Sequence, residues 1–194
     1  MRKESIKPYR KAWRMVGLIF PLLYLLTSRG VVLTFSAVVL SIFLILEGVR
    51  FKSSTVNDFL FRKASMILKG REKGHITSST WFVLASFFVA LLFERDVAIT
   101  AWLFTTFGDM AAEVVGIKWG RTKFLGKSLK GSLACLGTCL IVGLACWSLL
   151  RLPFAVVLAG ALAATVAELL PLPADDNFTM PLLAGAVMAL TRNF

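Results

Sequence analysis

Apolar stretches alternate with short polar segments along most of this chain of 194 residues. Seven of these stretches approach the length at which a helix crosses a membrane, and they cover residues 15–26, 31–46, 80–93, 97–115, 133–150, 154–170 and 179–190. Charged or turn-forming residues separate neighbouring stretches, as at Arg151-Leu152-Pro153. The pattern predicts an all-α fold, a polytopic membrane bundle of about seven transmembrane helices.

The longest polar segment, residues 48–79, interrupts this pattern. It carries several basic residues, and inside it apolar side chains recur at helical spacing. Ser54 or Thr55 is suited to cap such a helix at its start, and Gly70 is suited to end it. We expect a basic amphipathic helix that lies on the cytoplasmic face of the membrane.

The composition also favours a membrane protein. Hydrophobic residues make up 57% of the chain and the mean hydropathy is +0.77, which exceeds what is usual for soluble domains. We therefore expect residues 1–194 to form one integral membrane domain. The three cysteines lie in one apolar stretch without metal-binding spacing, so neither a zinc site nor a disulfide framework is expected.

The net charge of +11 would suggest a nucleic-acid partner for a soluble protein. Here the basic residues follow the positive-inside rule instead, because the expected spans leave only Arg29, Arg95, Arg151 and Arg192 of the 22 on the outer side. This uneven distribution of basic residues between the two sides of the membrane predicts a cytoplasmic N-terminus with a basic arm over residues 1–14. It also predicts no nucleic-acid partner. The apolar stretch after this arm lacks a small-residue cleavage site, so we expect a membrane helix there and not a cleaved signal.

Two carboxylates lie near the cytoplasmic end of the fourth apolar stretch. Asp109 and Glu113 are four residues apart, so a helix places them on one face. A carboxylate deep in a bilayer costs about 2.5–3.5 kcal/mol on insertion scales, so two of them need an explanation. Either they hold Mg²⁺, which takes carboxylate and phosphate oxygens, or they pair with Lys118 or Arg121 at the interface.

A basic, glycine-rich loop follows these carboxylates. Arg121, Lys123 and Lys127 are suited to offset phosphate charge, while Gly126 lets the backbone approach closely. The alternative is an ordinary basic loop on the cytoplasmic side. Gly126-Lys127-Ser128 is similar to the end of a Walker A loop, but the upstream glycine lies one residue too far away and an apolar helix replaces the strand. A P-loop fold is therefore excluded.

A second acidic group, Asp175, Asp176 and Asn177, follows two prolines after the sixth apolar stretch. Either an aspartate there holds a metal or takes the proton of an attacking hydroxyl, or the group is an Asx turn that caps the last helix. Glu168 either joins the metal ligands or sits at the interface. Because the expected topology puts both loops and residues 48–79 on one face, we expect them to converge on one cytoplasmic site.

Four motifs, taken in order, are similar to those of a known family. They are Gly108-Asp109-x-x-Ala112, Gly116-x-x-x-Gly120, Gly126-Lys127-Ser128-x-x-Gly131-Ser132 and Asp175-Asp176-Asn177-x-x-x-Pro181. Together they resemble the CTP-dependent lipid kinases, a group that includes dolichol kinase, phytol kinase and the yeast-type diacylglycerol kinase and is related to the phosphatidate cytidylyltransferases. Arg10-Lys11 and Arg71-Glu72 also look like family positions. The chain departs from the pattern at Arg14, where the family often has His, and at Lys130, where it often has Glu.

The resemblance implies a Mg²⁺-dependent kinase that transfers the γ-phosphate of a nucleotide, CTP, to a membrane lipid alcohol (a polyprenol, phytol or diacylglycerol) at the cytoplasmic face. The expected catalytic residues are Asp109, Asp175, Asp176 and Lys127, and the expected metal ligands are Asp109, Glu113, Asp176 and Glu168. The expected nucleotide-binding residues are Arg71, Glu72, Arg121, Lys123, Gly126, Lys127, Ser128 and Asn177. Two alternatives stay open: a cytidylyltransferase that makes a CDP-lipid from a phosphatidate-like lipid, and a membrane transporter with polar groups near mid-membrane.

Overall fold

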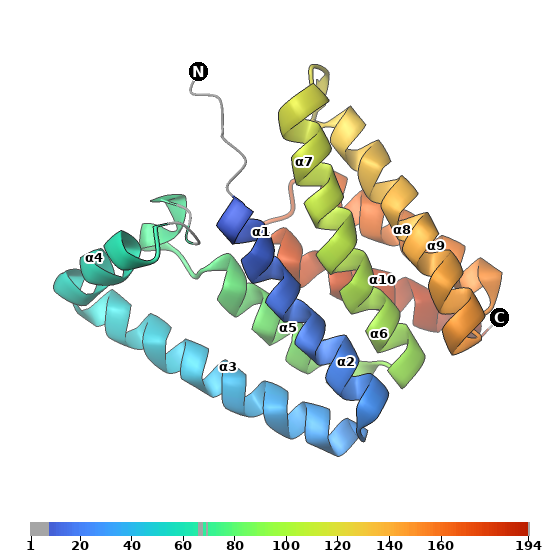
Figure 1. The fold of residues 1–194 in the computed structure, drawn as a ribbon, viewed down its shortest axis with the longest axis horizontal. Helices are drawn as coiled ribbons and strands as arrows, with labels where there is room; N and C mark the ends of the chain where they lie inside the picture. Colours follow the sequence, from blue (N-terminus) through green and yellow to red (C-terminus); the bar gives the residue numbers. More distant parts are fainter. Residues whose placement is uncertain (1–7, 66–67, 69, 194) are drawn as a thin grey trace.

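The computed structural model describes residues 8–65, 68 and 70–193, and within these ranges helices dominate (Figure 1). The first part of the chain forms α1 (Pro8–Met15), η1 (Val16–Leu18), α2 (Ile19–Leu26), α3 (Arg29–Lys52), α4 (Ser54–Lys63), η2 (Gly70–Gly74) and α5 (Ser78–Leu92). The second part forms α6 (Arg95–Leu103), η3 (Phe104–Asp109), α7 (Met110–Trp119), β1 (Lys123–Phe124), β2 (Lys127–Ser128), α8 (Leu129–Leu150), α9 (Phe154–Leu169) and α10 (Asp176–Arg192). The predicted basic arm is thus described only from Pro8 onward.

The helical class agrees with the apolar pattern, but the prediction of about seven transmembrane helices is wrong. Among the described residues, two helices, α3 and α8, are long and apolar enough to cross a membrane. The apolar helices at Ala12–Leu26, Ser78–Leu92 and Phe154–Leu169 are shorter. The physical reason is visible in α6, where every side chain from Val97 to Trp102 is buried in the core. A helix enclosed by other helices is as apolar in sequence as one that faces lipid.

The helices form a bundle in which α3 lies along one edge and α8 with α9 forms the opposite edge (Figure 1). The pairs α9–α10, α8–α9, α7–α8, α5–α10 and α3–α5 pack against one another. The largest fully buried side chains, Trp102 and Phe104, come from the α6–η3 segment. This segment therefore runs through the centre of the bundle, and it leads directly to Asp109.

Arginines hold the helix ends together at the end of the bundle away from the β-hairpin. Arg29 Nε, at the start of α3, donates to Ala90 O near the end of α5, 2.9 Å away. Arg95, at the start of α6, donates to Leu25 O near the end of α2. Arg192 forms ion pairs with acidic side chains at the start of α6. The contacts of Arg29 and Arg95 satisfy carbonyls that the helix geometry leaves without partners.

The amphipathic helix predicted in residues 48–79 is present as α4, with different limits. Ser53 caps it by accepting a hydrogen bond from Val56 N at 3.4 Å, in place of the predicted Ser54 or Thr55. Its last helical residue is Lys63, and the predicted end at Gly70 is instead the first residue of η2. The surface helix is therefore shorter than its apolar spacing suggested.

Candidate functional site

The basic glycine-rich loop folds as a β-hairpin, which the sequence analysis did not predict. Strands β1 and β2 pair antiparallel, with Phe124 opposite Lys127. The two residues between them, Leu125 and Gly126, have φ values of 50° and 84°, the left-handed conformation that two-residue hairpin turns require. The turn directs Lys127 toward the bundle and leaves Lys123 exposed.

Glycines bring this hairpin and the start of α8 close to α7. A Cβ at Gly131 would lie 2.8 Å from Ala112 O, and a Cβ at Gly120 would lie 2.2 Å from Ser128 Oγ. Ser128 caps α8, because its Oγ accepts a hydrogen bond from Gly131 N at 3.2 Å. The motif residues between Gly116 and Gly131 therefore set the position of Lys127 relative to α7.

Asp109, the last residue of η3, and Glu113, in the first turn of α7, both pair with Arg14 of α1. Arg14 Nη2 lies 3.0 Å from Asp109 Oδ2, and Nη1 lies 2.6 Å from Glu113 Oε2. This partner replaces the predicted alternatives, Lys118 and Arg121. Burial acts to lower the pKa of Arg14, but the carboxylates of Asp109 and Glu113 outweigh it and raise the pKa above its usual value. The guanidinium therefore stays charged.

Lys127 joins a second pair of carboxylates, Asp176 and Glu168. Its Nζ lies 2.5 Å from Asp176 Oδ2 and 3.5 Å from Glu168 Oε1. Glu168 is buried in α9 and also accepts a hydrogen bond from Ser132 Oγ at 2.7 Å. Burial acts to lower the pKa of Lys127, but Asp176 outweighs it and raises the pKa. Burial raises the pKa of Asp176, although Lys127 acts against this rise.

Asp175 is the N-cap of α10, so the predicted alternative of an Asx turn applies to this residue. Its Oδ1 accepts hydrogen bonds from Asn177 N at 3.0 Å and from Asn177 Nδ2 at 2.6 Å. Ser78 Oγ lies 2.9 Å from Asp175 Oδ2 and 2.6 Å from Glu72 Oε1. This chain of contacts ties the start of α10 to the start of α5 and to η2, and it leaves Asp176 to pair with Lys127.

The acidic groups from different helices lie close enough to act on one another. The charges of Asp109, Asp175 and Asp176 all act on Arg14, and the charge of Asp109 also acts on Lys127. Among the described residues, no three Asp, Glu, His or Cys side chains are grouped so that they could hold one metal ion. The structure thus brings the predicted acidic residues together, with a basic side chain bridging each pair.

Two predicted nucleotide-binding side chains stay apart from this cluster. Arg121 and Lys123 are exposed on the hairpin segment. The Arg71 side chain lies outside the described part of the structure, while Glu72 is buried beside Ser78. Fewer side chains of the basic loop therefore join the cluster than predicted. Of Arg121, Lys123 and Lys127, it is Lys127 that contacts the carboxylates.

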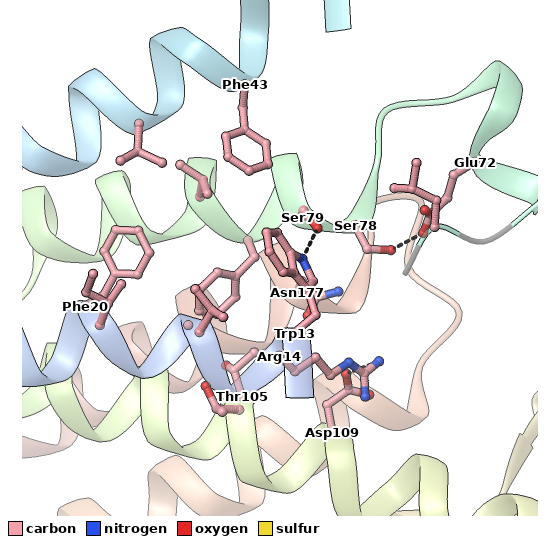
Figure 2. Close-up of a pocket in the computed structure, with 18 of the residues that line it drawn as sticks. Trp13, Arg14, Phe20, Phe43, Glu72, Ser78, Ser79, Thr105, Asp109 and Asn177 are labelled. Carbon is pink, nitrogen blue, oxygen red and sulfur yellow. Dashed lines mark hydrogen bonds and ion pairs between the residues drawn. The ribbon is translucent and has the colours of Figure 1, made fainter. Parts of the chain in front are cut away.

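A cavity of about 220 Å³ opens beside the cluster. Figure 2 shows Arg14, Asp109 and Glu72 around its polar part, with Phe20 at the other end. Thr106, one turn before Asp109, also lines this cavity. Sequence spacing predicts neither Thr106 nor Arg14 at the site, because helix packing brings them there.

A second, more open pocket of about 530 Å³ also has Glu72 in its wall. Its lining includes His75, Trp81 and Asp175. Glu72 borders both pockets, and Asp175 is joined to it through Ser78. An apolar cavity and an open pocket with polar and aromatic walls therefore share Glu72 in their walls.

Comparisons with known proteins give no function for this arrangement. No family model matches the chain, and no solved structure matches it. The chain is similar to "Uncharacterized protein RP860" of Rickettsia prowazekii (strain Madrid E), with 27% identity over 180 residues that cover 89% of this chain and 88% of that protein. The similarity spans nearly the full length of both chains.

Proposed function

We propose that this protein transfers the γ-phosphate of a nucleotide to the hydroxyl of a membrane lipid alcohol. The observation that carries the proposal is that an apolar cavity lined by Asp109 and an open pocket lined by Asp175 share Glu72 in their walls. Arg14 and Lys127 pair with the neighbouring carboxylates. Phosphoryl transfer depends chiefly on positioning the reactants and on offsetting negative charge. CTP as the donor rests on the resemblance of the sequence motifs.

The acidic residues fit a Mg²⁺–nucleotide complex better than a metal alone. Proteins usually hold Mg²⁺ through one or two carboxylates, with substrate phosphates and water completing the shell. Asp109 and Asp176, which act on each other electrostatically, would provide those carboxylates. When bound, Mg²⁺ offsets charge on the phosphates. Lys127 would share that role, and Asp175 would accept the hydroxyl proton of the alcohol.

We place the protein in a membrane, with the site and the N-terminus at the cytoplasmic face. In the apolar stretches of α3 and α8, 17% and 22% of the residues are buried, and outward residues such as Ile45 and Ile141 are exposed. Exposed apolar surface of this extent supports contact with lipid. Hydrogen bonds connect both helices to the site. Near the end of α3, Glu47 accepts one from Thr77, and near the start of α8, Ser132 donates one to Glu168.

The direct test uses purified protein in vesicles with Mg²⁺ and CTP labelled at the γ-phosphate. We expect label in a polyprenol, phytol or diacylglycerol when that alcohol is supplied, and none without Mg²⁺. The Asp58→Asn variant, altered at an exposed surface ion pair, serves as a control that keeps activity. Absence of label in every alcohol tested would contradict the proposal.

One observation favours a second candidate, cytidylyl transfer to a phosphatidate-like lipid. Arg14 lines the polar part of the apolar cavity, and a guanidinium there is suited to bind a lipid phosphate in two-point fashion. The position of the label separates the two reactions. A lipid labelled from α-labelled CTP and not from γ-labelled CTP would identify the cytidylyltransferase.

A further inference from the structure

The cavity beside Asp109 has one polar side and a long apolar wall. The wall comes from three helices, because Phe20 of α2 packs against Phe35 of α3 and Phe82 of α5, with ring centroids 5.7 and 5.8 Å apart. Apolar cavities of this kind exclude water and gain free energy when an apolar group fills them. The occupant of this cavity is therefore apolar along most of its length.

The polar side of the cavity contains a hydroxyl that lacks a partner. Thr106 Oγ1 is buried, the residue is 4% exposed, and no described residue offers this atom a hydrogen bond. The neighbouring Thr105 Oγ1 donates to Ala101 O at 3.0 Å. A buried hydroxyl without a partner is unfavourable, so Thr106 is satisfied when a ligand brings a polar group to this point.

We propose that the apolar chain of a lipid alcohol lies between α2, α3 and α5 in the cavity that Figure 2 shows. Its hydroxyl lies at Thr106, one turn from Asp109. The inference rests on the proposed function, since it names the binding site of that substrate. The apolar chain of the lipid enters the cavity from the side of α3. The opposite face of this helix carries exposed apolar residues such as Val38. Asp109, Arg14 and Asn177 then surround the head group.

The test is photolabelling without nucleotide or Mg²⁺, so it does not depend on catalysis. The probe is a long-chain primary alcohol with a diazirine in its chain, added to protein in phosphatidylcholine vesicles. We expect label in peptides of α2, α3 and α5 around Phe35 and Phe82. The Val39→Trp variant fills the cavity and should reduce this label about tenfold, whereas Val38→Trp, on the exposed face of the same helix, should leave it unchanged.

The hydroxyl contact is tested with the methyl ether of the same probe as competitor. Wild-type protein should prefer the alcohol about threefold to tenfold, the range of one neutral hydrogen bond. Thr106→Val, which keeps the side-chain shape, should abolish that preference, and Thr105→Val should retain it. Label confined to the outer faces of α3 and α8, or an unchanged preference in Thr106→Val, would overturn the inference. Labelling of the cavity without any phosphoryl transfer would support the site while contradicting the proposed reaction.

Discussion

At the site, one basic side chain contacts both carboxylates of each acidic pair. Arg14 lies between Asp109 and Glu113, and Lys127 lies between Asp176 and Glu168. Without these cations, repulsion between partly buried carboxylates would disfavour their charged forms. In the proposed reaction, the same arrangement presents two cations to the phosphates.

The Asp109→Asn substitution should leave the fold intact and reduce γ-phosphate transfer by about a hundredfold or more, the cost of losing one group that stabilises charge in a transition state. Asparagine keeps the shape of the side chain and a neutral contact with Arg14, so correct membrane insertion is expected. Transfer is measured with γ-labelled CTP, and folding by the thermal midpoint in detergent. Turnover at the wild-type rate would remove Asp109 from the proposed metal site.

The raised pKa of Asp176 predicts a dependence of nucleotide binding on pH. Burial keeps a larger share of this carboxyl protonated in mildly acidic solution than of an exposed aspartate. Since Mg²⁺ requires the carboxylate, affinity for the Mg²⁺–CTP complex should be full above the raised pKa and fall as the pH is lowered from neutrality through it. Calorimetry across this range measures the affinity. The Asp176→Asn variant should bind Mg²⁺–CTP weakly, and its affinity should not fall further in acid. Identical pH profiles in the wild-type protein and the variant would contradict the role of Asp176 as a metal ligand.

At the scale of elements, Arg50 positions the segment that carries Glu72. Arg50 lies at the end of α3 beside Glu47, is 4% exposed, and donates to the carbonyls of Glu72 and His75. Arg50→Met should destabilise the protein by about 3 kcal/mol, because Glu47 stays buried without its cation. Hydrogen exchange in residues 72–77 should accelerate. Arg62→Met on the exposed face of α4 is the control, and equal exchange in both variants would show that Arg50 has no such role.

The contact of α7 with α8 can be tested with two glycines of the same helix. Gly131→Ala should destabilise the protein by about 1–3 kcal/mol, since its Cβ would lie 2.8 Å from Ala112 O. Gly137→Ala should stabilise it by about 0.5–1 kcal/mol, since no heavy atom lies within 4 Å of the new Cβ. Thermal midpoints of the purified variants measure both effects. A shift of the same sign in both would mean that the close packing at Gly131 does not constrain the helices.

For the molecule as a whole, the sequence predicted where helices form and which acidic residues meet, because apolar periodicity and helix ends are local signals. It did not predict the hairpin, since two residues per strand are too few to show alternation and the turn depends on Leu125 and Gly126. The pairing of Arg14 with Asp109 was also missed, because only tertiary packing brings α1 to η3. The predicted number of membrane spans was too high because buried helices such as α6 are apolar without facing lipid.

The proposed membrane position requires that the hairpin and the arginine-rich end of the bundle lie on opposite sides of the bilayer. Lys123→Cys, exposed on the hairpin, should react with a membrane-impermeant maleimide only when the cytoplasmic side is accessible. Glu94→Cys, before α6 and 72% exposed at its side chain, should react from the other side. The native cysteines are buried and should give little background. Reaction of both variants from one side would contradict a membrane crossed by α3 and α8, because each helix joins one of these ends to the other.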